Sequence, residues 1–376
     1  MSSFDVIVIG GGIVGTTSAY ALSKHGQRVL LLDQYDIPNE WAASGDHARV
    51  FRYTYGKDLF YTELAVRALN LWKEFQKECR EELYVPIGML DLATKEGGYE
   101  AACYQALKDM RLPVEKLGPA ELRERYRILN ARAFRYAVFH PDGGMLWAQR
   151  AVTAYATAAS RKGAVIRKNI RISQLVRGNG GIREIRDQDG KSWKADSYLF
   201  AAGSWSRELL SAYKLPLKVT RQELLYFRPP QNQGRYRPEH CPVFACSSRG
   251  FYGFPVHIHG FMKIGSQRKG PSGKPGPSSQ GPSPRFEKVC RKFLREFIPD
   301  VAGFVETEEK VGYYNNTPDG DFILDRLRGE SNAFIATGFA GHGFSFGPLL
   351  GSLMADLMLK GKTDVNIQRF QLSRFR

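Results

Sequence analysis

The chain has 376 residues, is 43% hydrophobic and carries a formal net charge of +16. This length allows two domains with a sizeable core, and the longest apolar run is too short to span a bilayer. The N-terminus has no basic segment and carries Asp5, which does not fit a signal peptide. We therefore expect a cytoplasmic protein without a membrane partner.

The net charge and the cysteines exclude little but set expectations. A basic balance attracts anionic substrates or nucleic acid, or keeps a protein in solution. Because no nucleic-acid motif accompanies it, we interpret it as a solvated surface and regard nucleic acid as an unlikely partner. An odd number of cysteines without C-x-x-C pairs argues for reduced thiols rather than disulfides or zinc; they are Cys79, Cys103, Cys241, Cys246 and Cys290.

Residues 4–33 carry the strongest local signal. The run Val6-Ile7-Val8-Ile9 is typical of a buried parallel strand, and a G-x-G-x-x-G follows it at Gly10, Gly12 and Gly15. In such a turn the first glycine permits a tight bend, the second a close approach to a pyrophosphate, and the third close helix–strand packing. The helix that follows presents its N-terminus to phosphates.

A second strand, 29–32, ends at Asp33, where a carboxylate can accept hydrogen bonds from an adenosine ribose. Strand, glycine turn, helix, strand and acid in register predict a dinucleotide site. FAD and NAD share this fingerprint, so the stretch alone does not distinguish them.

Residues 44–52 are small or basic. Arg49 and Arg52 are three residues apart, so on a helix they would share a face. Such an arginine can hold a carboxylate through two parallel hydrogen bonds, and two surface arginines are an equal alternative.

The next part of the chain alternates between patterns. Helices are predicted over 59–82, 99–110, 119–126 and 147–162, with strands over 85–93, near 165 and over 172–176. A hairpin is predicted around Asp189-Gly190. A strand over 197–201 leads into Ala202-Gly203-Ser204-Trp205, which returns the chain to the nucleotide site.

Residues 218–265 alternate as in an antiparallel sheet. His257 and His259 alternate along an expected strand, but no third ligand is evident, so no metal site is predicted. Residues 268–285 are expected to form a flexible loop, followed by a helix over 286–297. Near the end, a strand over 332–336, a glycine-rich turn over 338–346 and an apolar helix over 349–359 form a second strand-to-helix turn, whose helix dipole could face a ligand that becomes negative.

Several stretches together resemble the monomeric sarcosine oxidase and N-methyltryptophan oxidase branch of the D-amino-acid-oxidase-like flavoproteins, in order over nearly the whole chain. The stretches are the N-terminal fingerprint, Arg49 to Arg52 with Tyr55-Gly56, Ala202-Gly203-Ser204-Trp205, Tyr252-Gly253-Phe254-Pro255 with Lys263-Ile264-Gly265, Tyr314 with Asp319 and Asp325, and the turn Gly338 to Phe346. The G-F-x-G-H-G-F-x-F turn is the most specific of them.

The resemblance implies an α/β (α+β) fold, in which a Rossmann-type FAD-binding domain is interrupted by a mainly antiparallel β-sheet substrate domain. The expected FAD domain comprises 1–85, 140–216 and 305–376, and the expected substrate domain comprises 86–139 and 217–304. It further implies oxidation of an amine C–N bond to an imine, with O₂ as the oxidant and H₂O₂ as a product. We expect a monomer acting on a small amine or amino acid.

The resemblance also assigns roles to residues. Lys263 is expected near the flavin, where a cation promotes the O₂ step, and Arg52 is expected to hold the substrate carboxylate. Tyr252 and Tyr314 are expected to form pocket walls or to donate hydrogen bonds. The expected cofactor contacts are Gly10, Gly12, Ile13, Val14, Gly15, Asp33, Gln34, Ser44, Arg49, Ile170, Ala202, Gly203, Trp205, Gly312, Gly338, Gly341, His342, Gly343, Phe344 and Ser345.

The chain departs from this family pattern at three positions. Gly312 stands where the oxidases carry a cysteine bonded to the flavin, so we expect non-covalent FAD. Ser345 replaces a lysine that helps to hold the substrate carboxylate, and Gln267 replaces a histidine. We therefore expect a secondary, N-alkylated or cyclic amino acid bulkier than sarcosine. Alternatives are a dehydrogenase or a natural-product tailoring oxidase on the same fold, and an RNA-binding flavoenzyme.

Overall fold

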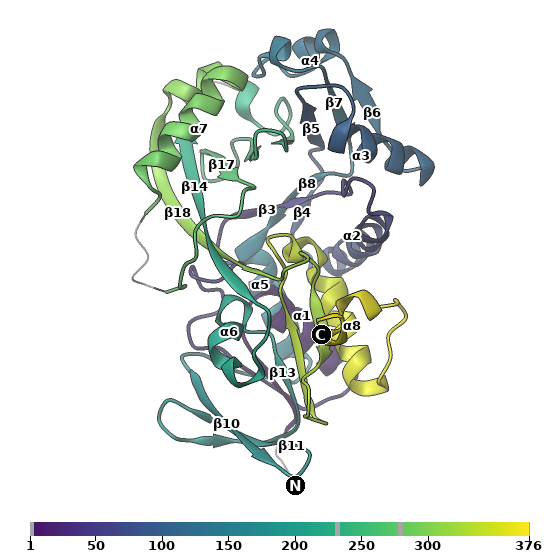
Figure 1. Cartoon of the computed structure of the whole chain (residues 1–376), viewed down its shortest axis with the longest axis vertical. Helices are drawn as coiled ribbons and strands as arrows, with labels where there is room; N and C mark the ends of the chain where they lie inside the picture. Colours follow the sequence, from purple (N-terminus) through teal and green to yellow (C-terminus); the bar gives the residue numbers. More distant parts are fainter. Residues whose placement is uncertain (1–3, 230–233, 277–280, 376) are drawn as a thin grey trace.

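The computed structural model describes residues 4–229, 234–276 and 281–375. Two large sheets organise them, one in the lower half of Figure 1 and one in the upper half. The helices are α1 (Ile13–Lys24), α2 (Leu59–Cys79), α3 (Gly98–Asp109), α4 (Pro119–Arg125), α5 (Ala148–Arg161), α6 (Ser206–Leu209), α7 (Pro284–Phe297) and α8 (Gly347–Lys360). In the described ranges, no helix combines the length and the apolar character that crossing a bilayer requires.

The six-stranded sheet is the nucleotide-binding type that the N-terminal fingerprint predicts. Its order is β19 (Ile323–Arg326), β20 (Ala333–Thr337), β13 (Ala195–Phe200), β1 (Phe4–Ile9), β2 (Val29–Leu32) and β9 (Val165–Arg167). All neighbours are parallel except β19 and β20. Alternate residues of β1 face α1, α5 and α8 on one side and the small sheet β10 (Ile172–Gly178), β11 (Gly181–Asp187) and β12 (Ser192–Trp193) on the other.

The eight-stranded sheet is mixed, with antiparallel neighbours except at one parallel junction between β15 and β5. Its order is β18 (Val305–Asn316), β14 (Lys218–Arg228), β17 (Met262–Ser266), β16 (Phe251–Phe254), β15 (Val243–Cys246), β5 (Met89–Ala93), β7 (Tyr136–His140) and β6 (Glu115–Leu117). The long strands β14 and β18 run from the side of α6 up to α7 in Figure 1.

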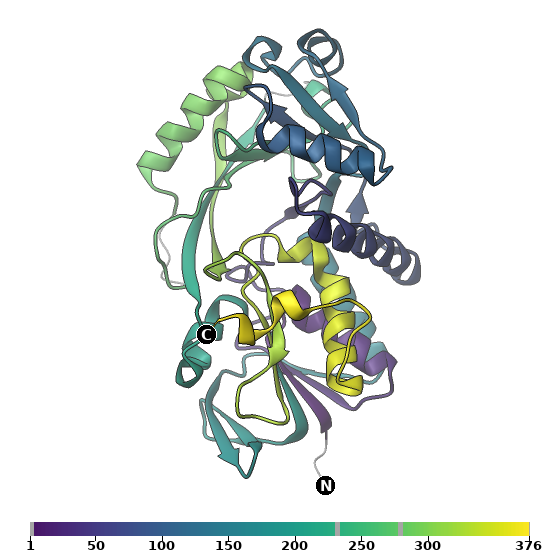
Figure 2. The same cartoon turned by 45° about the vertical axis from the view of Figure 1, so that its right-hand side comes forward.

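The two faces of this sheet differ. One face packs against α7, whose first turn is capped by Ser283 and whose apolar residues recur at helical spacing. Figure 2 shows α7 on the outer side of the upper half. The opposite face carries Tyr252, Phe254 and Lys263, and it lies against the small sheet β3 (Ala48–Phe51), β8 (Gly144–Trp147) and β4 (Tyr84–Val85).

The structure excludes a shared helical face for Arg49 and Arg52, and it shows that the strand expected at His257 and His259 is wrong. Arg49 belongs to strand β3 and not to a helix, so Arg49 and Arg52 do not share a helical face. His257 and His259 lie in a tight turn between β16 and β17, closed by a hydrogen bond from Gly260 N to His257 O of 2.8 Å. In both places a tertiary pairing decides the local structure, because β3 is held by β8 and β16 by β17.

The strand predicted over 85–93 is two strands, β4 and β5, which belong to different sheets. Other boundaries shift only slightly. The helix predicted over 59–82 ends at Cys79, since Arg80 adopts a left-handed φ of 57°. The predicted loop 268–285 ends where α7 begins at Pro284, and its residues 277–280 lie outside the described ranges.

Candidate functional site

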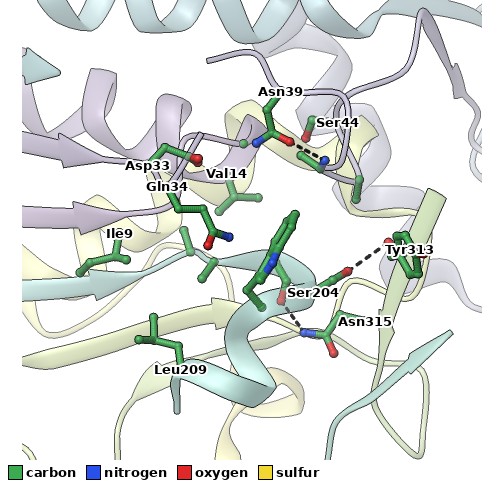
Figure 3. A pocket seen from close by; sticks show the side chains of 18 of the residues that line it. Ile9, Val14, Asp33, Gln34, Asn39, Ser44, Ser204, Leu209, Tyr313 and Asn315 are labelled. Atoms are coloured by element: carbon green, nitrogen blue, oxygen red, sulfur yellow. Dashed lines mark hydrogen bonds between the residues drawn. The ribbon is translucent and has the colours of Figure 1, made fainter. Parts of the chain in front are cut away.

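A cavity of about 330 Å³ lies at the carboxyl ends of β1, β2 and β13 (Figure 3). In open α/β sheets this is the edge where ligands bind. Its walls come from the N-terminal fingerprint, the segment 42–49, the residues after β13, strand β18 and the turn 339–344. Segments that are distant in the sequence therefore form one elongated site.

The glycine turn makes one end suitable for phosphate groups. Gly10 has a φ of +111°, and a Cβ there would lie 2.5 Å from Ala201 O, so only glycine fits. Helix α1 begins at Ile13 with no acidic side chain in its first turn. Ser44 Oγ accepts a hydrogen bond from Ile13 N at 3.1 Å, and the other first-turn N–H groups remain for a ligand.

Asp33 closes the same end of the cavity (Figure 3). Its carboxylate accepts hydrogen bonds from Gly11 N at 2.6 Å and from Tyr35 N at 2.8 Å. Burial raises its pKa, while these two N–H groups lower it. The backbone thus fixes the carboxylate, and each oxygen keeps a lone pair for a further donor.

The other end is formed by β18 and the C-terminal glycine-rich turn. Gly341 has a φ of +85°, and a Cβ there would lie 2.4 Å from the Tyr314 ring. Asn315 Nδ2 donates to Gly203 O at 2.7 Å, and Ser204 Oγ donates to Tyr313 O at 3.2 Å. These two bonds, drawn in Figure 3, tie β18 to the residues after β13.

Most of the expected cofactor contacts line this cavity: Gly10, Gly12, Ile13, Val14, Asp33, Gln34, Ser44, Arg49, Ile170, Ala202, Gly203, Trp205, Gly341, Gly343 and Phe344. The structure does not place Gly15, Gly312, Gly338, His342 and Ser345 among the lining residues. Gly15 packs α1 on β1 instead, because a Cβ there would lie 1.7 Å from Gly10 O.

His342 and Ser345 point away from the cavity. The His342 ring lies 4.8 Å from the Phe322 ring, and burial lowers its pKa to about 3. Ser345 Oγ donates to Val50 O at 3.3 Å. Both side chains therefore brace the turn against neighbouring parts of the fold.

Lys263 is fully buried in an ion-pair network that the sequence did not reveal. Its Nζ donates to the Asp46 carboxylate and, at 2.9 Å, to Ala48 O. Arg49 Nη1 also donates to Asp46, at 2.6 Å, and the Tyr226 hydroxyl is a third donor to the same carboxylate.

This network shifts the pKa values of Asp46 and Lys263. Burial alone would raise the pKa of Asp46, but Lys263 and Arg49 hold it well below its usual range. Burial lowers the pKa of Lys263 to about 8, although Asp46 raises it. Asp46 and Tyr226 were missed by sequence reasoning, and the only local signal was that Asp46 precedes Arg49 by three residues.

Arg52 lies apart from Arg49 and does not line the cavity. Its Nη1 donates to Thr54 O at 2.6 Å and to the Tyr99 hydroxyl at 2.7 Å. Its guanidinium carbon lies 4.7 Å from the Tyr55 ring centroid. In the described part of the chain, Nε and Nη2 of Arg52 form no hydrogen bond, and neither is among the fully buried atoms without a partner.

Tyr252 and Tyr314 lie close together in the same buried region. Burial raises the pKa of both phenols, and the Tyr314 hydroxyl raises that of Tyr252 further. Tyr252 also lies beneath Lys263, whose Nζ is 5.8 Å from the ring centroid. Both tyrosines therefore act as neutral hydrogen-bonding groups.

Residues 5–357 match the family described as FAD dependent oxidoreductase, and the chain belongs to this family. The match covers both large sheets, the N-terminal glycine motif and the C-terminal turn.

Two curated relatives are similar over their full length. Monomeric sarcosine oxidase of Bacillus sp. (strain B-0618) is 31% identical over 379 residues, covering 99% of this chain and 96% of the relative. N-methyl-L-tryptophan oxidase of Salmonella agona (strain SL483) is 29% identical over 384 residues, covering 99% of both. The fold is also that of L-proline dehydrogenase from P. horikoshii, with a TM-score of 0.88, 22% identity and coverage of 100% of this chain and 98% of that one.

FAD fits the residues present. The cavity offers a free helix N-terminus and a glycine cradle for the diphosphate at one end and a carboxylate fixed by two N–H groups for the ribose. At the other end, the turn 339–344 lines the cavity and would hold the rest of the cofactor. The α/β fold, the FAD dependence and the oxidoreductase class expected from the sequence are confirmed.

Proposed function

We propose that the protein is an oxidase that uses FAD to oxidise the C–N bond of a secondary, N-alkylated or cyclic amino acid. The observation that carries the proposal is the Arg52 guanidinium, which is anchored through Nη1 while Nε and Nη2 make no hydrogen bond in the described ranges. A planar cation held in this way suits a carboxylate. The two curated relatives, oxidases of N-methylated amino acids by name, support it.

Bound FAD would accept a hydride from the carbon next to the substrate nitrogen and would pass two electrons on to O₂. The chain's residues orient the substrate and control charge around this reaction. Arg52 binds the carboxylate, and Tyr252 and Tyr314 shape the wall between Arg52 and Lys263. The substrate nitrogen must be neutral, since an ammonium has no lone pair to assist hydride loss.

Lys263 supplies the cation for the O₂ step in this proposal. It is 1% exposed, so its charge acts in a dry environment, where a fixed charge counts most. Asp46 fixes the ammonium in place and offsets part of its charge. This offset gives specific support to a second candidate, a dehydrogenase that passes electrons to an acceptor other than O₂.

We further propose that FAD is held without a covalent bond. None of the five cysteines lines the cavity. Gly312 stands on β18, offers no nucleophilic side chain, and has open space where a Cβ would project. Ser345 supplies no positive charge, so the carboxylate relies on Arg52.

The proposed division of the chain places 1–85, 140–216 and 305–376 in the FAD domain and 86–139 and 217–304 in the substrate domain. We propose a cytoplasmic monomer. The enzyme assignment is tested by a peroxide-coupled screen of N-methyl, cyclic and D-amino acids together with amines that lack a carboxylate. Turnover with one H₂O₂ formed for each substrate supports an oxidase, whereas flavin reduction without H₂O₂ supports the dehydrogenase.

A further inference from the structure

Buried polar atoms without partners gather beside Arg52. In the described ranges they belong to Thr54, Tyr55, Asp91 and His140. Arg52 donates to the Thr54 carbonyl and lies over the Tyr55 ring. Burial is the main cause of the pKa shifts of Asp91, which is raised, and His140, which is lowered, and the charge of Arg52 acts to lower both. Unpaired buried polar groups are rare and destabilising. Several around one cation indicate a place built to receive a polar group.

Asp91 is the acidic residue among these four. It is 1% exposed, and neither carboxylate oxygen has a hydrogen bond of good geometry within the described ranges. Burial raises its pKa to about 6, and the charge of Arg52 and the nearby Thr54 hydroxyl only partly oppose this. The Thr54 hydroxyl is thus the neighbouring donor, and the remaining lone pairs of the two carboxyl oxygens can accept hydrogen bonds from a ligand.

The sheet register places Asp91 on the face that carries the proposed substrate wall. On β5, Leu90 and Leu92 belong to the core under α7, so Asp91 points to the opposite face. Asp91 is paired with Ala245, and Ala245 with Tyr252, in one row across neighbouring strands. Two strand spacings separate Asp91 from Tyr252, roughly 10 Å, with only the small Ala245 side chain between them.

Within the described ranges, Arg52 does not donate a hydrogen bond to Asp91. Its Nη1 is occupied by Thr54 O and the Tyr99 hydroxyl, and in the described ranges no hydrogen bond joins Arg52 to Asp91. In the proposed reaction its other nitrogens bind the substrate carboxylate. Asp91 thus remains an acceptor next to the position where an amino acid would be held.

We infer that Asp91 is a specificity-determining residue that accepts a hydrogen bond from an N–H or O–H donor on the side chain of the substrate amino acid. This inference rests on the proposed function. It narrows the substrate class to secondary or N-alkylated amino acids with a polar, donor-bearing side chain, and a cationic donor forms the strongest bond with the carboxylate.

The test compares substrate pairs of similar shape in which one member carries a donor group where the other carries a methyl group. Suitable pairs are Nα-methyl-L-ornithine with Nα-methyl-L-norleucine, Nα-methyl-L-asparagine with Nα-methyl-L-leucine, and Nα-methyl-L-serine with Nα-methyl-L-2-aminobutyrate. The variants are Asp91→Leu and Asp91→Asn, and the matched control is Glu100→Gln. Glu100 is 6% exposed and also has an oxygen without a partner in the described ranges, so this control removes a buried charge nearby. Anaerobic flavin spectra report ligand binding independently of turnover.

For at least one pair, the wild-type enzyme is expected to favour the donor-bearing member in kcat/KM by about tenfold or more. Asp91→Leu should abolish or invert this ratio while flavin content is retained, Asp91→Asn should reduce it, and Glu100→Gln should keep it. A ratio near one in the wild type, or an equal rise in KM for both members in Asp91→Leu, overturns the inference and leaves the proposed oxidase function standing. If no member of any pair binds or is turned over, the result contradicts both the inference and the proposed oxidase function.

Discussion

Replacing Lys263 by methionine removes the buried cation while keeping an unbranched side chain of similar length. Lys263 is 1% exposed and is anchored by Asp46 and by Ala48 O. In the proposed reaction O₂ becomes negatively charged when it takes up electrons, and the Lys263 cation would stabilise that charge. Lys263→Met is therefore expected to slow flavin reoxidation far more than anaerobic flavin reduction.

The size of the effect follows from the environment of Lys263. A preorganised charge in a site that excludes water contributes about 3 kcal/mol to the transition state, which is roughly a hundredfold in rate or more. Asp46 loses one of its donors but keeps Arg49 and the Tyr226 hydroxyl. The loss of folding stability should therefore fall below the ~3–5 kcal/mol typical of a broken buried ion pair.

Stopped-flow absorbance measures the two half-reactions separately. Enzyme reduced anaerobically by substrate is mixed with O₂-containing buffer, and the return of the oxidised flavin spectrum gives the reoxidation rate. Lys218→Met serves as a control, because Lys218 is an exposed lysine of the same sheet. Equal slowing of both half-reactions in Lys263→Met would show that Lys263 does not act specifically in the O₂ step and only shapes the pocket.

Four further outcomes are expected. Arg52→Ala should raise KM at least about tenfold for carboxylate substrates with flavin content unchanged, and an unchanged KM on the best substrate would point to a carboxylate-free amine. Acid precipitation of the wild-type protein should leave FAD in the supernatant, whereas a yellow pellet would show covalent attachment at a residue other than Gly312. Flavin reduction should quicken with rising pH as the substrate amine loses its proton. Flavin reoxidation should slow above pH 8 as Lys263 loses its proton, since the pKa of Lys263 is about 8. The pH profiles of the two half-reactions measure both effects. Gly341→Ala should lower flavin retention more than Gly361→Ala, because both glycines have positive φ but only a Cβ at Gly341 meets a neighbouring ring. The measurement is flavin content per purified chain, and similar values for the two variants would contradict the prediction.

Contiguous signals were readable from the sequence. Strand, glycine turn, helix and acid in residues 4–33 are local, and each glycine has a requirement that follows from backbone geometry: Gly10 faces Ala201 O and Gly15 faces Gly10 O. Most of the cavity could be predicted for this reason. The remaining walls came from the resemblance, which aligned segments that lie far apart in the chain.

Pairings across the chain could not be predicted. Asp46 and Lys263 are 217 residues apart, so no periodicity connects them. The separation of Arg49 from Arg52 depends on the pairing of β3 with β8, which overrides helical spacing. The position of Asp91 in one row with Tyr252 depends on the parallel junction between β5 and β15. The alternation of residues along a single strand does not predict which strands pair.

Whether the protein is an amino acid oxidase is tested by anaerobic titration of the purified yellow protein with N-methylated and cyclic amino acids, followed by admission of air. At least one such substrate is expected to bleach the flavin without O₂, and air is expected to restore the colour with one H₂O₂ formed for each flavin. Flavin that no amino acid bleaches, while a carboxylate-free amine does, would contradict the amino acid assignment. Bleached flavin that air does not restore would contradict the oxidase assignment.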